Sequence, residues 1–257
     1  MIRAWLDMPP AGIFVTLAVL YFGMAAILAG VAFASPARRP IQMLHGVVAP
    51  FFNAVAILFA LLTGFLANDI GDRSRMANRT VHSEAGELRN IHTLSVAAAS
   101  DMKTIRVALK TYAASIVAEE WPAMHDFKSA PGTATAYDNL LREVSQPGLS
   151  RASGQAVHSA LLNATVHAGT LRNARLAVAG DLTNDLKWLV VIVLGLFTQV
   201  AIGLVHLERP RAFVAALVVF SSAVVITLGI IALQEYPFSG TFRVSPVPIE
   251  NIQKLSD

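Results

Sequence analysis

Four long segments of this chain contain no charged side chain, and they constrain its fold more than any other feature. Each is about as long as the roughly 20 helical residues that cross the hydrocarbon core of a bilayer. Because lipid offers no hydrogen-bond partners, a run of this length satisfies its own backbone as a helix. The runs are Ala11–Ala34, Gly46–Ala67, Trp188–Leu207 and Ala212–Leu233. The sequence therefore predicts an all-α integral membrane protein with four transmembrane helices, whose first partner is the lipid bilayer.

The four spans are predicted to form two hairpins with a polar insert between them. The first hairpin covers residues 1–67 (spans 11–34 and 46–67), and the second covers residues 188–233 (spans 188–207 and 212–233). Residues 68–187 are predicted to form a helical extramembrane domain. Residues 234–257 form an extramembrane tail that is rich in proline, which rules out a long helix there.

Apolar residues at helical spacing support the helical interpretation of the insert. They predict one helix over Ser74–Ala99 and a second helix after Asp101, which is a suitable N-cap residue. Trp121-Pro122 is expected to end or offset that second helix. The segment Ser150–Lys187 has few helix breakers and is predicted to run straight into the third span.

Composition and motifs exclude several classes of function. A net charge of +3 is too small to indicate nucleic-acid binding, and the absence of cysteine excludes disulfides and thiolate chemistry. The sequence has no P-loop, dinucleotide fingerprint, Gly-x-Ser-x-Gly or Glu-x-x-His motif. We therefore expect no catalytic residues, no metal site and no cofactor. Two groups of ionisable residues in the insert, around Glu84 and around Glu120, are interpreted as solvated helix faces with local ion pairs.

The second span leaves two alternatives open. Asn53, Ile57 and Gly64 lie on one small, partly polar stripe of the helix, and a neighbouring stripe that includes Phe52, Phe59 and Thr63 is more aromatic. One hypothesis is a pore-lining helix, in which Asn53 and Thr63 face water and Phe52 or Phe59 forms a hydrophobic constriction. The other is ordinary helix packing with an interhelical hydrogen bond, for which Gln199 is a candidate partner of Asn53.

Basic residues in the two short connectors predict the orientation. Ser35–His45 and Glu208–Arg211 lie on the same side of a four-span protein, and each carries two arginines. The positive-inside rule places both connectors in the cytoplasm. The expected location is the bacterial inner membrane, as a multi-pass protein with its insert in the periplasm.

Several short stretches together resemble the bacterial bestrophin-like integral membrane family, a group of unknown function. The stretches are Gly64-Phe65-Leu66, Arg79, Val81-His82-Ser83-Glu84-Ala85, Tyr112, Glu120-Trp121-Pro122, Pro237-Phe238-Ser239-Gly240 and Val244-Ser245-Pro246. The resemblance implies a distant relation to bestrophins, which are oligomeric anion channels whose second span lines the pore. By position in that span, it implies Phe51, Phe52, Asn53 and Phe59 as candidate pore residues.

Two functional hypotheses from different classes follow. The first is a homo-oligomeric, anion-permeable ion channel in which a ring of subunits surrounds inorganic ions with the second spans innermost. The candidate vestibule charges just beyond that span are Asp69, Arg73, Arg75, Arg79 and Glu84. The arginines would concentrate anions, whereas Asp69 and Asp72 would favour cations. The second hypothesis is a membrane scaffold or sensory subunit whose helical insert binds a partner or a ligand.

Overall fold

The computed structural model describes residues 2–34, 49–98 and 100–256, with side chains described from residue 52 onward in the second of these ranges. Within these residues the protein consists of helices and contains no strand, as predicted. The chain divides into two compact units. The membrane unit contains Met1–Gly71 and Thr183–Glu235, and the helical unit contains Asp72–Leu182 and Tyr236–Asp257.

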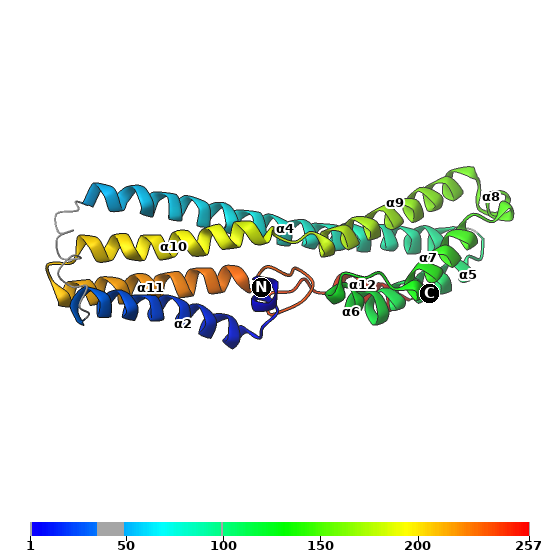
Figure 1. Ribbon diagram of the computed structural model, residues 1–257. Coiled ribbons are helices and arrows are strands. Elements are labelled where there is room, and N and C mark those ends of the chain that lie inside the picture. The colour runs from blue at the N-terminus through cyan, green and yellow to red at the C-terminus, as the bar shows by residue number, and fades with distance from the viewer. Residues whose placement is uncertain (1, 35–48, 99, 257) are drawn as a thin grey trace. The chain divides into compact units, whose positions relative to one another are not determined.

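The membrane unit holds the membrane-spanning helices. Among the described residues, four helical segments are long and apolar enough to cross a bilayer, as expected for a multi-pass membrane protein. Helices α2 and α11 pack side by side, and α10 contacts both (Figure 1). The elements are α1 (Ile2–Leu6), α2 (Pro10–Ala29), the π-helix η1 (Gly30–Ala34), the first part of α4 (Ala49–Ala97), α10 (Asp185–Val205) and α11 (Pro210–Ala232).

A polar contact ties three helices together inside the membrane unit. The Gln199 side-chain amide donates hydrogen bonds to the Tyr21 carbonyl at 2.9 Å and to the Ser221 hydroxyl at 2.8 Å. Tyr21 in turn donates from its hydroxyl to the Ile192 carbonyl at 3.0 Å. The predicted pairing of Gln199 with Asn53 is therefore wrong. The Gln199 amide nitrogen bonds α2 and α11, its amide oxygen has no hydrogen-bond partner among the described residues, and Asn53 is exposed.

The predicted continuous helix over Ser150–Lys187 is also wrong. The chain forms α8 (Pro147–Ser153) and α9 (Gln155–Gly180), and residues 181–184 are not helical before α10 begins. The Glu235 carboxylate accepts a hydrogen bond from the Thr183 backbone amide at 2.8 Å and another from the Trp188 indole at 3.2 Å. This buried carboxylate satisfies an amide that a helix would otherwise have used, so the break is stable.

Amphipathic helices build the helical unit around one apolar core, as the periodicity predicts. The buried side chains include Val81 and Leu88 from α4 and Ile105 and Leu109 from α5. Helix α5 packs against α7 and α12, and α7 packs against α9. The elements are the remainder of α4, α5 (Lys103–Ser115), the π-helix η2 (Ile116–Glu120), α6 (Trp121–Ala123), the 3₁₀ turn η3 (Met124–Asp126), α7 (Pro131–Val144), α8, α9 and α12 (Val247–Gln253).

A π-helical turn shows how Trp121-Pro122 affects its helix. Pro122 has no backbone N–H, so it cannot continue the α-helical hydrogen-bond ladder of α5. The chain instead widens into η2 over Ile116–Glu120 and then continues as α6. The dipeptide therefore offsets the helix, which finally ends at Phe127 with a left-handed backbone (φ 59°).

Candidate functional site

The membrane-spanning part of α4 has two sides with different environments. Asn53, Ala60 and Gly64 are exposed in the isolated subunit, and Ile57 is 65% exposed. These residues form the small, partly polar stripe identified in the sequence. An asparagine in a membrane span requires a hydrogen-bond partner or water. This stripe is therefore available for water or for another subunit.

The aromatic stripe of the same helix packs inward. The ring centroids of Phe59 and Phe220 of α11 are 5.8 Å apart, and both Phe52 and Phe220 pack against the apolar cluster of the membrane unit. Thr63 is buried, and its hydroxyl has no hydrogen-bond partner among the described residues. Phe52, Phe59 and Thr63 thus lie away from the Asn53 stripe. The side chain of Phe51 is outside the described residues.

The candidate vestibule charges occupy several environments. Asp69 forms an ion pair with Lys187 in the membrane unit. In the helical unit Arg75 pairs with Asp72 at 2.5 Å, and both of these side chains are more than half exposed. Arg79 is exposed and Arg73 is half-buried.

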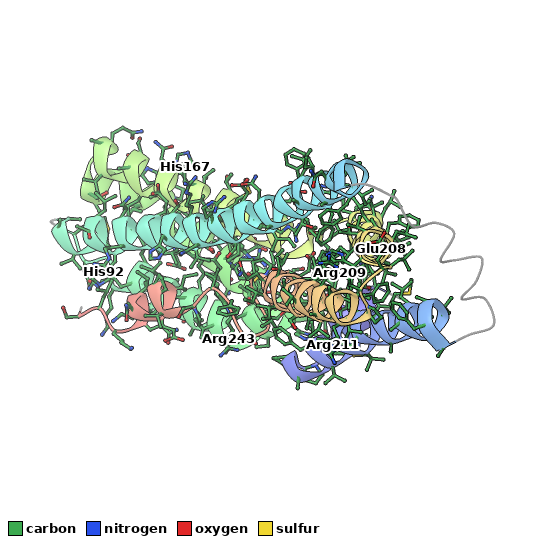
Figure 2. All side chains as sticks on the ribbon, turned by 90° about the vertical axis from the view of Figure 1, so that its left-hand side faces the viewer. His92, His167, Glu208, Arg209, Arg211 and Arg243 are labelled. Atoms are coloured by element: carbon green, nitrogen blue, oxygen red, sulfur yellow. The ribbon has the colours of Figure 1, made fainter. Side chains whose placement is uncertain are left out.

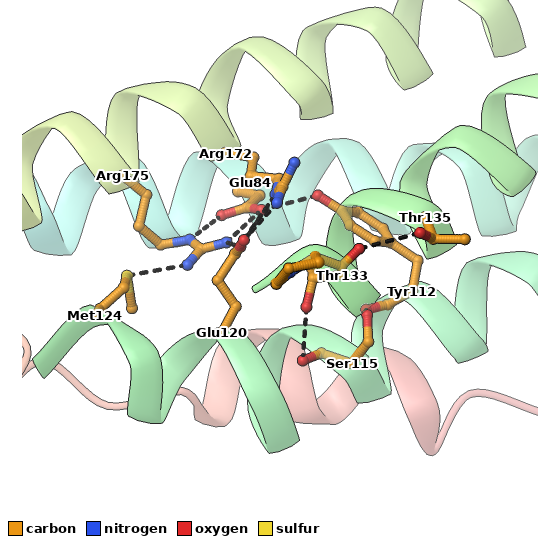
Figure 3. Close-up of polar contacts among 10 residues, drawn as sticks. Glu84, Tyr112, Ser115, Glu120, Met124, Thr133, Thr135, Arg172 and Arg175 are labelled. Atoms are coloured by element: carbon orange, nitrogen blue, oxygen red, sulfur yellow. Dashed lines mark hydrogen bonds and ion pairs between the residues drawn. The ribbon is translucent and has the colours of Figure 1, made fainter. Parts of the chain in front are cut away.

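Glu84 differs from the other candidates because it is completely buried within the subunit. It accepts a 2.7 Å hydrogen bond from Arg175 Nε of α9, and the Tyr112 hydroxyl of α5 lies 3.5 Å from the same carboxylate (Figure 3). A charge that is neutralised inside the core contributes little field to a vestibule. The prediction that places Glu84 in a vestibule is therefore wrong for this arrangement of the subunit.

Glu120 completes a buried cluster of two carboxylates and two guanidinium groups. Arg175 Nη2 reaches Glu120 Oε2 at 2.8 Å, and Arg172 Nε lies 3.1 Å from both Glu120 oxygens. The formal charges of Glu84, Glu120, Arg172 and Arg175 sum to zero, which removes the need for a buried counter-ion. Four oxygens and two forked donors form a fixed polar network inside the apolar core.

Met124 and Trp121 also contact the Arg175 guanidinium, in addition to the two carboxylates. The Met124 sulfur accepts from Arg175 Nη1 at 3.2 Å, and the guanidinium carbon lies 5.6 Å from the centre of the Trp121 ring. Burial alone would lower the pKa of Arg175, but Glu84 and Glu120 outweigh it and hold this pKa above its ordinary value. Burial raises the pKa of Tyr112 well above its ordinary value, and the Glu84 carboxylate raises it further.

The interpretation of the Glu84 and Glu120 groups as solvated faces is wrong for these two residues. His125 and Asp126 do form an exposed local pair at 3.0 Å, as expected. The missed signal is positional. Glu84 occupies the same apolar stripe as Val81 and Leu88, and Arg172 and Arg175 similarly continue the buried stripe of α9. Opposite charges at core positions of facing helices indicate a buried ion cluster.

No group of three or more histidine, aspartate or glutamate side chains in the described part of the chain is arranged to hold a metal ion. Glu208 and Arg209 lie in the connector between α10 and α11, and Arg211 lies in the first turn of α11 (Figure 2). The other predicted basic connector, Ser35–His45, lies outside the described residues.

Residues 19–249 match the family model of the bestrophin-like domain. The chain belongs to the bestrophin-like family. A variant of the bacterial bestrophin homologue from Klebsiella pneumoniae has a TM-score of 0.69 at 15% identity, over 94% of this chain and 96% of that chain. Another structure of that homologue has a TM-score of 0.67 at 13% identity, over 93% and 96% of the two chains. A solved variant of a membrane protein gives 0.70 at 12% identity, over 94% and 96%. At this level of identity, the matches show that the chain shares its fold with these proteins. No curated protein matches the chain.

Proposed function

We propose that this member of the bestrophin-like family is a homo-oligomeric anion channel whose pore is lined by the exposed stripe of α4. Family membership supports an ion-channel kind of function. The observation that carries the finer proposal is the exposed position of the polar Asn53 side chain in a span without charged residues. Exposure of an amide to hydrocarbon is unfavourable, whereas a ring of subunits would surround it with water. Four helices alone are too few to enclose a hydrated pore readily.

Ile57 replaces Phe52 and Phe59 as the proposed constriction. It is the largest apolar side chain of the exposed stripe, and it is 65% exposed in the subunit. A ring of such side chains would gate by expelling water from a narrow pore. Phe59, by contrast, is held against Phe220 and serves the packing of the subunit.

The charges near the span favour anions in this proposal. The two acidic side chains that would attract cations are each paired, Asp69 with Lys187 and Asp72 with Arg75. Arg79 is exposed on the same helix. A positive potential at the entrance raises the local concentration of anions.

Ion flux in liposomes tests the proposal with a matched pair of variants. The purified protein is reconstituted, and chloride and potassium fluxes are measured under imposed gradients. We expect chloride flux in the wild type and altered conductance in Ile57→Ala and Asn53→Leu. Phe59→Ala removes a larger side chain from the same helix and should lower thermal stability without changing selectivity. Arg79→Gln should lower the preference for chloride over potassium.

Two outcomes would refute this assignment. A lack of flux for both ions across pH and calcium concentration would favour a scaffold or sensory role with a partner protein. A selectivity change in Phe59→Ala with none in Ile57→Ala would place the pore on the opposite side of α4.

We propose further that the channel lies in the bacterial inner membrane with the helical unit in the periplasm. Arg209 and Arg211 support this orientation, because short basic connectors remain in the cytoplasm.

A further inference from the structure

A groove on the membrane unit lies between α4 and the N-terminal part of α10. Its volume is about 580 Å³. Leu62 and Phe65 of α4 and Val190 of α10 contribute apolar walls, whereas Asp69 and Lys187 lie at its rim. Phe65 is 61% exposed and Val190 is 42% exposed, so the walls are only partly covered by the subunit. The groove combines an apolar channel with a charged end.

The rim of the groove coincides with the ends of two uncharged runs. The second run ends at residue 67 and the third begins at residue 188, so Asp69 and Lys187 lie where hydrocarbon gives way to lipid headgroups. The apolar walls extend from this rim into the spans. An occupant with a charged head and an apolar tail matches this distribution of surfaces.

The charges of the rim indicate the chemistry of that head. Lys187 and Asp69 form an ion pair, and their side chains are 56% and 45% exposed. A solvent-exposed pair contributes little net stability, so a headgroup can insert between its members at small cost. The rim has one positive and one negative group, which suits a headgroup that is itself neutral overall and carries both signs.

The groove is separate from the stripe assigned to the pore. Leu62 follows Asn53 by nine residues, which is two and a half turns of an α-helix with about 3.6 residues per turn. These two residues therefore project from opposite sides of α4. The inference that follows depends only on the membrane location of α4 and α10, and it holds independently of ion conduction.

We infer that this groove binds one zwitterionic phospholipid with a primary ammonium headgroup, of the phosphatidylethanolamine class. The lipid phosphate is placed beside the Lys187 ammonium and the lipid ammonium beside the Asp69 carboxylate. One acyl chain follows the walls formed by Leu62, Phe65 and Val190. Charge-assisted hydrogen bonds at both ends of the headgroup give the site its preference.

Native mass spectrometry of the full-length protein in detergent tests the site. Phosphatidylethanolamine and phosphatidylglycerol with identical acyl chains are titrated separately, so that only the headgroup differs. We expect the wild type to bind the ethanolamine lipid about tenfold more tightly, as one charged hydrogen bond to the lipid ammonium supplies. Asp69→Asn should abolish this preference, and Lys187→Gln should weaken the binding of both lipids. Val190→Trp should fill the groove and reduce both.

The double variant Asp69→Lys with Lys187→Asp is the matched control. It keeps the ion pair and the net charge, and it offers the same two charges to the headgroup in exchanged positions, so the ethanolamine preference should return. Equal binding of the two lipids by the wild type would overturn the inference, as would a preference that survives Asp69→Asn. Dissociation of the oligomer by Val190→Trp with unchanged lipid binding would show that a second copy of the chain occupies the groove.

Discussion

Removal of Arg175 from the buried cluster should destabilise the protein more than any other single change among its four charged members. Arg175 is completely buried and bonds both carboxylates, whereas Arg172 bonds Glu120 alone among the described members of the cluster. In Arg175→Met, Glu120 keeps Arg172, but Glu84 retains only the 3.5 Å contact with the Tyr112 hydroxyl. Loss of one partner from a buried ion pair costs about 3–5 kcal/mol. For a chain of this size, about 2–4 °C per kcal/mol converts this cost into a fall in Tm of about 6–20 °C.

Tryptophan fluorescence during thermal unfolding in detergent measures this effect. Trp121 contributes to the signal and lies beside the Arg175 guanidinium. Arg172→Met is the comparison, and it should lower Tm less, since Arg175 still pairs with Glu120. The double variant Arg175→Met with Glu84→Gln also removes the carboxylate that Arg175→Met leaves unpaired, and it should recover more than half of the lost Tm. A fall of less than about 2 °C in Arg175→Met, or a double variant less stable than the single one, would refute the reasoning.

Two further predictions concern pH and orientation. Because the pKa of Tyr112 is raised above its ordinary value of 10.0, its contribution to stability is complete below pH 10 and is lost as pH rises further. Tm measured from pH 8 to 11 should therefore fall above pH 10, and it should fall less in Tyr112→Phe; equal slopes would contradict the assignment. The chain has no cysteine, so single cysteines report on sidedness. In intact cells, a membrane-impermeant maleimide should label His167→Cys of the helical unit and reach Glu208→Cys only after lysis, whereas the reverse pattern would invert the topology.

Helix periodicity predicts much of this fold, because the residues of a helix that face lipid or the apolar core are apolar at regular positions in the sequence. The structure confirms four helical segments able to cross a bilayer among the described residues, and it confirms the buried stripe that includes Val81 and Leu88. Local sequence does not predict the backbone conformation where a side chain that is distant in the sequence determines it. The break between α9 and α10 depends on Glu235, which lies 52 residues from Thr183.

The site was predicted less completely than the fold, for a related reason. A stripe of Asn53, Ile57 and Gly64 can be recognised in one helix, but the packing of Phe59 depends on Phe220 of α11. Likewise, the charge of Glu84 favours a surface position, although the residue lies on the apolar stripe that includes Val81 and Leu88. Charge type alone does not distinguish a vestibule residue from a core residue, whereas its position on an apolar stripe does.

The buried cluster also constrains the order in which the protein can assemble during synthesis. Arg175 follows Glu84 by 91 residues, and ribosomes add about 5–20 residues per second, so Glu84 waits about 5–20 s for its partner. The second membrane hairpin is then made before α12, which packs on α5 in the helical unit. Closure of the helical core therefore comes last, after all four spans have been synthesised.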